Sequence, residues 1–179
     1  VILFHKSGFR FFKYFYCHMI IPFWKSAFPK LLSYNRFIEI MPRCLQALSS
    51  FFHQVKGEDT GICIIDSTKL VVCHNLRIKR HRVFKGLAGR GKSSTGWFYG
   101  FKVHIVINNL GEIINLKITS GSVHDVAVLE SLTQELKGIL LGDKGYLSKA
   151  KTEALAARGL RLLTPSRKNM KNKPIQTEE

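Results

Sequence analysis

Two aspartates stand where short apolar segments of the sequence end, and their positions suggest metal-dependent chemistry. Asp66 closes the run ICIID, residues 62–66, and Asp143 closes ILLGD, residues 139–143. Both runs are typical of buried strands. If the strands are parallel neighbours, both carboxylates emerge at one sheet edge and offer Mg²⁺ the hard oxygen ligands of two-metal phosphoryl transfer. For either aspartate alone, the commoner role is to cap the turn after a strand.

The segment GLAGRGKSS, residues 86–94, matches the phosphate-loop pattern G-x-x-x-x-G-K-S. A working loop of this kind joins a buried strand to a helix, whose N-terminus holds the phosphates. Here the preceding RIKRHRVFK is too charged for a central strand, and the following STGWFYGF favours a strand over a helix. Because both flanks are wrong, the match does not predict a nucleotide hydrolase.

Positive charge is the clearest indication of a partner. The chain has 179 residues, with 28 lysines and arginines against 12 acidic residues, and its formal net charge is +16. Hydrophobic residues make up 45% of it, enough for a folded core. A folded basic domain is expected to bind a polyanion, with DNA the leading candidate.

Two acid-free basic runs are the expected DNA contacts. The first extends from Lys69 to Lys92 with eight lysines and arginines, and the second is SRKNMKNK, residues 166–173. A solvated basic loop is the alternative for the first run. The predicted DNA-binding residues are Arg77, Lys79, Arg80, His81, Arg82, Lys85, Arg90, Lys92, Lys144, Arg167 and Lys168.

The elements that must position these residues fall into two regions. Residues 1–56 carry aromatic residues at helical spacing with prolines between them, which predicts two or three short helices. Residues 57–179 predict a mixed α/β sheet with helices on its faces. The expected order is a strand (62–66), a hairpin (97–108 and 112–120), a helix (122–138), a strand (139–143), a helix (148–159) and a strand (160–164).

Cysteine spacing and hydropathy indicate the cellular environment of the protein and argue against membrane association. The four cysteines are widely spaced and form no C-x-x-C pair, which argues against a zinc knuckle or a disulfide framework. A reducing, cytoplasmic setting fits them best. Lys6, Arg10 and Lys13 interrupt the apolar N-terminal stretch, so no run of 18 apolar residues predicts a membrane span or a membrane partner.

Specific strings connect these features to a known family. The segments RGKSSTGWFYGFK and GDKGY, in this order and spacing, with HKSGFRFFKYFY upstream and SRKNMKNK downstream, resemble the DDE transposases of bacterial insertion sequences, most closely insertion-sequence family nine-eight-two. The resemblance extends over residues 4–173. It implies an RNase H-like core, Mg²⁺- or Mn²⁺-dependent cleavage and strand transfer on the element's DNA ends, and a homo-oligomer on DNA. It maps the first two catalytic, metal-binding acids to Asp66 and Asp143.

The third acid of that family has no counterpart in the sequence. In the family it is a glutamate on a helix well beyond the RKNMKN stretch, whereas this sequence stops at NKPIQTEE. Glu178 follows Pro174 with no helix after it, and Glu153 is expected to face solvent, so neither is a good substitute. We therefore expect an incomplete, inactive transposase fragment. The alternative is a non-catalytic DNA-binding remnant.

Several other polar residues have two possible roles. His124 and Asp125 could lie near the acidic edge, but the S-x-x-D pattern from Ser122 favours a helix cap. Lys144 and Tyr146 could touch DNA phosphate or pack locally. Lys102 and His104 lie on the less apolar face of their strand and are expected to face DNA or water.

Overall fold

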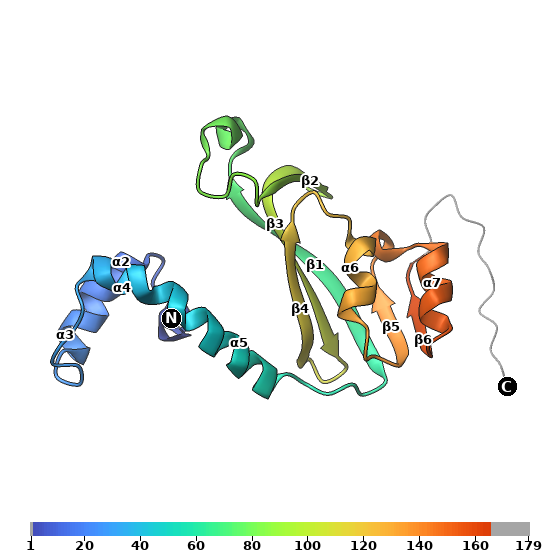
Figure 1. Cartoon of the computed structure of the whole chain (residues 1–179), viewed down its shortest axis with the longest axis horizontal. Helices are drawn as coiled ribbons and strands as arrows, with labels where there is room; N and C mark the ends of the chain where they lie inside the picture. Colours follow the sequence, from blue (N-terminus) through green and yellow to red (C-terminus); the bar gives the residue numbers. More distant parts are fainter. Residues whose placement is uncertain (1, 166–179) are drawn as a thin grey trace. The chain divides into compact units, whose positions relative to one another are not determined.

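The computed structural model describes residues 2–165, and the chain divides into two compact units, Val1–Val55 and Lys56–Glu179 (Figure 1). Each unit has its own cluster of buried side chains. Within the described range, no helix is long and apolar enough to cross a membrane.

The first unit is a set of short helices rather than the two or three that its sequence predicts. Phe15, Tyr16 and Ile20 are buried at its centre, and other aromatic side chains pack around them. Ser33 caps the fourth helix, because its Oγ accepts a hydrogen bond from the Arg36 amide. The α-helices are α1 (Ile2–Lys6), α2 (Phe12–Phe15), α3 (Ile21–Trp24), α4 (Tyr34–Ile40) and α5 (Cys44–Val55).

The second unit is a mixed sheet with two helices. Its strands lie in the order β2-β3-β1-β5-β6, and β4 also pairs with β3. β1 pairs antiparallel with β3 and parallel with β5, and β5 pairs parallel with β6. The elements are β1 (Ile62–Cys73), β2 (Gly89–Ser93), β3 (Gly96–Asn108), β4 (Ile113–Ser120), α6 (Asp125–Leu132), β5 (Gly138–Gly142), α7 (Lys149–Ala156) and β6 (Leu160–Leu163).

This arrangement is an RNase H-like mixed sheet with flanking helices, as the sequence predicts. The path β4-β3-β1 is an antiparallel meander, and β5 and β6 extend it in parallel through the helical crossovers α6 and α7. One strand was not expected. β2 pairs with Gly96–Gly100 at the beginning of β3 and turns the basic segment back onto the sheet.

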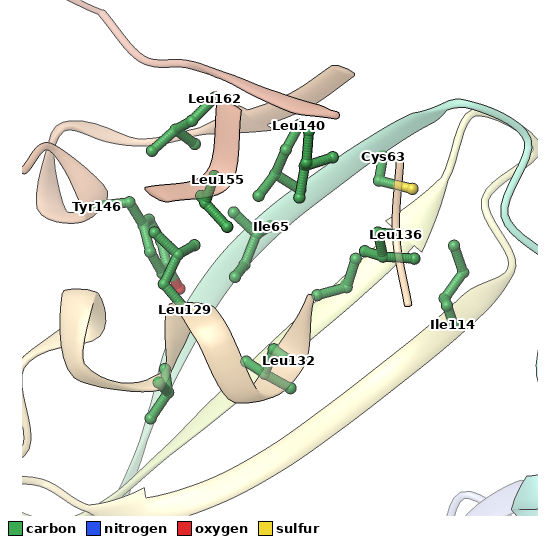
Figure 2. Packing of buried hydrophobic residues seen from close by; sticks show 13 residues of the cluster. Cys63, Ile65, Ile114, Leu129, Leu132, Leu136, Leu140, Tyr146, Leu155 and Leu162 are labelled. Carbon is green, nitrogen blue, oxygen red and sulfur yellow. The ribbon is translucent and has the colours of Figure 1, made fainter. Parts of the chain in front are cut away.

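The core lies between the sheet and the two helices. Figure 2 shows Leu129 of α6 near Ile65 of β1, and Leu132 of α6 and Leu140 of β5 belong to the same buried cluster. Leu155 of α7 joins the same cluster and is fully buried. Burial of large aliphatic side chains contributes about 1.5–3 kcal/mol each, so this layer holds β1 and β5 against the two helices.

The buried face of β3 is not the one that its apolar pattern suggests. Lys102 and His104 were expected to face DNA or water, but they lie beneath α6: His104 is fully buried and Lys102 pairs with Asp125. The apolar residues of the opposite face are only partly buried. These are Phe101, Val103, Ile105 and Ile107. The alternation was correctly predicted. The expected orientation was wrong for His104, which is buried, whereas Lys102 lines the pocket that also holds Asp66.

The predicted helix over 122–138 is also too long. α6 begins at Asp125 and ends at Leu132, where Thr133 leaves the helical conformation. The Thr133 hydroxyl donates a hydrogen bond to the Leu129 carbonyl, and Gly138, with φ near 85°, starts β5. The chain therefore reaches the sheet earlier than helical periodicity indicates.

Candidate active site

The parallel register of β1 and β5 places the two aspartates together. Ile65 pairs with Gly142, and Asp66 and Asp143 are the next residues on the two strands. Neighbouring strands lie about 4.8 Å apart, so the two aspartates lie side by side. The predicted strand 62–66 is too short, however: β1 continues to Cys73, so Asp66 lies within its strand and only Asp143 follows a strand end. β5 ends at Gly142, and Asp143 leads into a short 3₁₀ helix, Lys144–Tyr146.

A pocket of about 300 Å³ opens at this edge. Three carboxylates line it, those of Asp66, Asp125 and Asp143. Three lysines line it as well, namely Lys69, Lys92 and Lys102. The remaining lining residues are Ser67, Thr68, Ser93, Ser94, Thr95, Phe98, Gly145 and Tyr146. The mixture of acids and cations suits a metal ion beside a phosphate better than it suits an apolar ligand.

Asp125 has a different role from the helix cap that its sequence suggests. The cap position of α6 is His124, which makes no capping hydrogen bond with its side chain. The Asp125 carboxylate instead accepts hydrogen bonds from Lys102 Nζ at 3.1 Å and from the Ser67 hydroxyl at 3.2 Å. The capping interpretation is therefore wrong, and Asp125 connects α6 to β3 and to the residue after Asp66.

Buried polar groups extend this network beneath the pocket. His104 Nε2 lies 2.9 Å from the Thr119 hydroxyl, and Nδ1 lies 3.5 Å from the Tyr146 hydroxyl. Burial lowers the pKa of His104, although the negative charge of Asp125 opposes the change. Burial raises the pKa of Tyr146 above its usual range, and the charge of Asp125 adds to this. Both groups are thus neutral near pH 7, and they pack beneath the residues that line the pocket.

Within the described residues, Asp66 and Asp143 differ from Asp125 in lacking a counter-ion. Among residues 2–165 neither forms an ion pair, and Asp66 accepts one hydrogen bond, at 2.7 Å from the Ser67 amide. Two exposed carboxylates at one edge are hard oxygen donors of the kind that Mg²⁺ and Mn²⁺ prefer. Over the same range, however, no group of three or more His, Cys, Asp or Glu is placed to hold a metal ion.

A comparison with protein families matches residues 56–179 to the transposase DDE domain. The chain belongs to this family. Comparison with curated proteins gave no match. Among solved structures, the chain is similar to a piggyBac transposase in a synaptic complex with hairpin DNA, at 15% identity and a TM-score of 0.49. The similarity covers 84% of this chain and 32% of that one, so the chain spans about a third of that protein's length.

The basic run from Lys69 to Lys92 is not one loop: it covers parts of three elements and a turn segment that holds Arg82 and Lys85. Lys69 belongs to β1, a 3₁₀ helix covers Asn75–Arg80, and Arg90 and Lys92 lie on β2. Eight of the predicted contacts are exposed and form no ion pair in the described range. These eight are Arg77, Lys79, Arg80, Arg82, Lys85, Arg90, Lys92 and Lys144.

His81 is less available to DNA than the sequence suggests. Its Nε2 accepts a hydrogen bond from the Phe84 amide, and its ring stacks on Phe84. Tyr146 was expected either to touch DNA phosphate or to pack locally. It is buried in the core of the DDE domain, so it packs locally. Arg167, Lys168 and Glu178 lie outside the described residues.

The phosphate-loop match is not a nucleotide site in the DDE domain. Gly89–Ser93 forms β2, which turns directly into β3, so no helix N-terminus follows the lysine. Gly91 allows close packing there, since a Cβ on it would lie 2.1 Å from the Gly121 carbonyl oxygen.

Glu153 faces solvent, as expected. Its carboxylate on α7 lies 3.9 Å from Lys149 Nζ, and 67% of its side chain is exposed.

Proposed function

We propose that this DDE domain acts in DNA cleavage and strand transfer during movement of a bacterial insertion sequence, related to insertion-sequence family nine-eight-two. One observation carries the proposal: Asp66, inside β1, and Asp143, directly after β5, lie next to each other on two neighbouring parallel strands and line one pocket. The family membership supports this class of chemistry. The setting we propose is the bacterial cytoplasm, with two or more copies of the chain assembled on DNA.

In this proposal Asp66 and Asp143 are the first and second acids and hold Mg²⁺ or Mn²⁺. A divalent metal there would stabilise charge on the attacking and leaving oxygens of the phosphoryl transfer. Asp125 is the poorer ligand because Lys102 already neutralises it. Its role is to hold Ser67, the residue after Asp66 on β1, in place.

The lysines of the pocket hold the DNA strand. Lys69 and Lys92 line the pocket beside the aspartates, on strands β1 and β2. Ammonium groups at this position pair with the phosphates that flank the reacting one and also reduce repulsion between DNA and the acids. Further along the chain, the exposed cations of residues 77–85 add phosphate contacts that do not depend on sequence.

Asp125 is a third carboxylate in the pocket but is already paired with Lys102, so a site of three unpaired acids needs one more carboxylate than residues 2–165 offer. We therefore propose that residues 1–179 on their own bind DNA but do not cut it appreciably in Mg²⁺. The second candidate function, a DNA-binding protein without catalysis, is favoured by the same observation. The two candidate functions differ in one expectation: only the catalytic one predicts that, once a third acid is supplied, DNA cleavage depends on Asp66 and Asp143.

The experiment is an end-cleavage assay on DNA carrying the element's terminal repeat, with the chain alone and with the chain extended by the coding sequence that follows it. Asp143→Asn is the test variant, and Glu153→Gln removes the same charge from an exposed site as its matched control. We expect metal-dependent cutting by the extended chain that Asp143→Asn abolishes and Glu153→Gln retains. Cutting that survives Asp143→Asn, or an extended chain that binds but never cuts, would contradict the catalytic proposal.

A further inference from the structure

Trp97 has an unusual environment for a large aromatic residue. It lies at the start of β3 and is 53% exposed. Lys92 is its directly paired neighbour on β2, so the two side chains lie on the same side of the hairpin. Arg90 lies two residues before Lys92 on the same strand, and its side chain points to the same side.

Both cations lie against the indole ring. The Arg90 guanidinium carbon lies 4.8 Å from the ring centroid, and Lys92 Nζ lies 5.9 Å from it. These are cation–π distances. Because both contacts come from β2, and half of the Trp97 surface remains exposed, the residue presents a flat apolar surface with positive charge beside it.

The surrounding backbone holds this surface in position. The Asn75 side-chain amide donates a hydrogen bond of 2.9 Å to the Trp97 carbonyl oxygen. The pairing of Lys92 with Trp97 and of Arg90 with Tyr99 fixes the hairpin on the other side. Ordered aromatic residues lose little conformational entropy on binding, which favours them as contact surfaces.

Lys92 connects this surface to the acidic pocket. It lines the pocket together with Asp66 and Asp143, and Ser93, Ser94 and Thr95 of the hairpin line it too. Trp97 itself does not line the pocket, whereas Phe98, the next residue on β3, does, so the indole ring lies outside the pocket and Lys92 is the residue that the two share. A nucleic-acid strand that leaves the pocket past Lys92 can reach Trp97. The ligand chemistry that matches a flat apolar ring between cations is an unpaired base attached to phosphates.

We propose that Trp97, Arg90 and Lys92 form a stacking platform for one unpaired nucleobase of a DNA strand that passes the acidic pocket. The base stacks on the indole ring, and the two cations contact the phosphates on either side of it. In a duplex the faces of the bases are covered by their neighbours, so the platform selects single-stranded or locally opened DNA. The inference rests on the proposed function only in taking DNA as the partner.

The sequence contains two tryptophans, so Trp24→Phe leaves Trp97 as the sole indole fluorophore. This variant is titrated with oligo(dT) of ~10 nucleotides, within the site size of such surfaces, and with a duplex of equal length, both in EDTA. We expect oligo(dT) to quench the fluorescence and the duplex to leave it nearly unchanged. Quenching by both to the same extent, or by neither, overturns the proposal.

Affinity measurements on the full chain complete the test. Trp97→Ala should weaken oligo(dT) binding about 5- to 150-fold, the range for losing one stacked base, and change duplex binding less than about twofold. Trp97→Phe keeps a ring and should recover most of the loss. Equal losses on both DNAs, or no recovery in Trp97→Phe, contradict stacking. Because metal is absent, this result is independent of whether the chain cleaves DNA.

Discussion

Asp125 provides a quantitative test of the network beneath the pocket. The perturbation is Asp125→Ala, which removes the counter-charge of Lys102 and the acceptor of the Ser67 hydroxyl. The side chain of Lys102 is only 13% exposed and that of Asp125 22%, so water replaces the lost carboxylate poorly. The Lys102 ammonium keeps one acceptor, the Val123 carbonyl oxygen at 3.0 Å.

The expected magnitude follows from these contacts. Removing one partner of a buried ion pair costs about 3–5 kcal/mol. Since this pair is partly solvated and Lys102 retains a carbonyl, we expect Asp125→Ala to lower the free energy of unfolding by about 2–3 kcal/mol. Asp125→Asn keeps an oxygen for Ser67 and should cost about 1–2 kcal/mol. In the double variant with Lys102→Met, no unpaired ammonium is left, so most of the loss should disappear.

The assay must report on the second unit alone, because the chain has two compact units and a single unfolding curve can mix them. Native-state hydrogen exchange at the amides of β3 meets this need. We expect the Asp125 and Lys102 substitutions to be coupled by about 1–2 kcal/mol in a double-mutant cycle. Strictly additive effects would refute the reasoning, because they would mean that the two charges do not interact.

Two further predictions concern pH and salt. Burial lowers the pKa of His104, so below about pH 6.5 the unfolded chain binds a proton that the folded chain does not. The stabilising effect of neutral His104 is therefore fully present above that pH. It is lost as the pH falls through the folded-state pKa, by at most about 1.4 kcal/mol per pH unit. Hydrogen-exchange rates of the β3 amides at several pH values measure this loss, and an equal pH dependence in His104→Gln would contradict the prediction. Replacing Arg80, Arg82 and Lys85 by alanine should weaken duplex binding and reduce its log–log salt slope by about 0.9 per lost phosphate contact, measured by fluorescence anisotropy at several salt concentrations; an unchanged slope would exclude these residues as contacts.

The sequence predicts the order of the strands in the second unit, apart from β2, because each of the others leaves a local signal. The runs ending at Asp66 and Asp143 are short, apolar and β-branched, and a helix of adequate length separates β4 from β5. Such a crossover makes parallel pairing of β1 with β5 the natural outcome. The meeting of the two aspartates at one edge is thus foreseeable from local pattern plus topology.

The role of Asp125 was not foreseeable in that way. Its S-x-x-D spacing is a local feature that suggests a cap, whereas its partners Ser67 and Lys102 lie 58 and 23 positions away. The inward orientation of His104 had a similar cause. A strand's alternation shows two faces but not which one the helices cover, and polar residues can be buried when they satisfy one another's hydrogen bonds.

The basic segment illustrates a third limit. Its high charge argues against a strand in the core, and the run from Lys69 to Lys92 reads as one loop. β2 forms within it as an additional strand beyond β3, where Arg90 and Lys92 can point to solvent while Gly89 and Gly91 pack closely against the Ser120–Ser122 segment. The cation–π cluster on Trp97 follows from this pairing, and composition alone could not indicate it.

The most direct test of the central claim is to map the metal site chemically. Fe²⁺ replaces Mg²⁺ at oxygen-ligand sites, and with ascorbate and peroxide it cleaves the backbone beside its ligands. We predict that the full chain is cut next to Asp66 and Asp143, that excess Mg²⁺ suppresses both cuts, and that Asp66→Asn or Asp143→Asn abolishes them while Glu153→Gln does not. Cuts elsewhere in the chain, or cuts that persist in both aspartate variants, would contradict a metal site at this edge of the sheet.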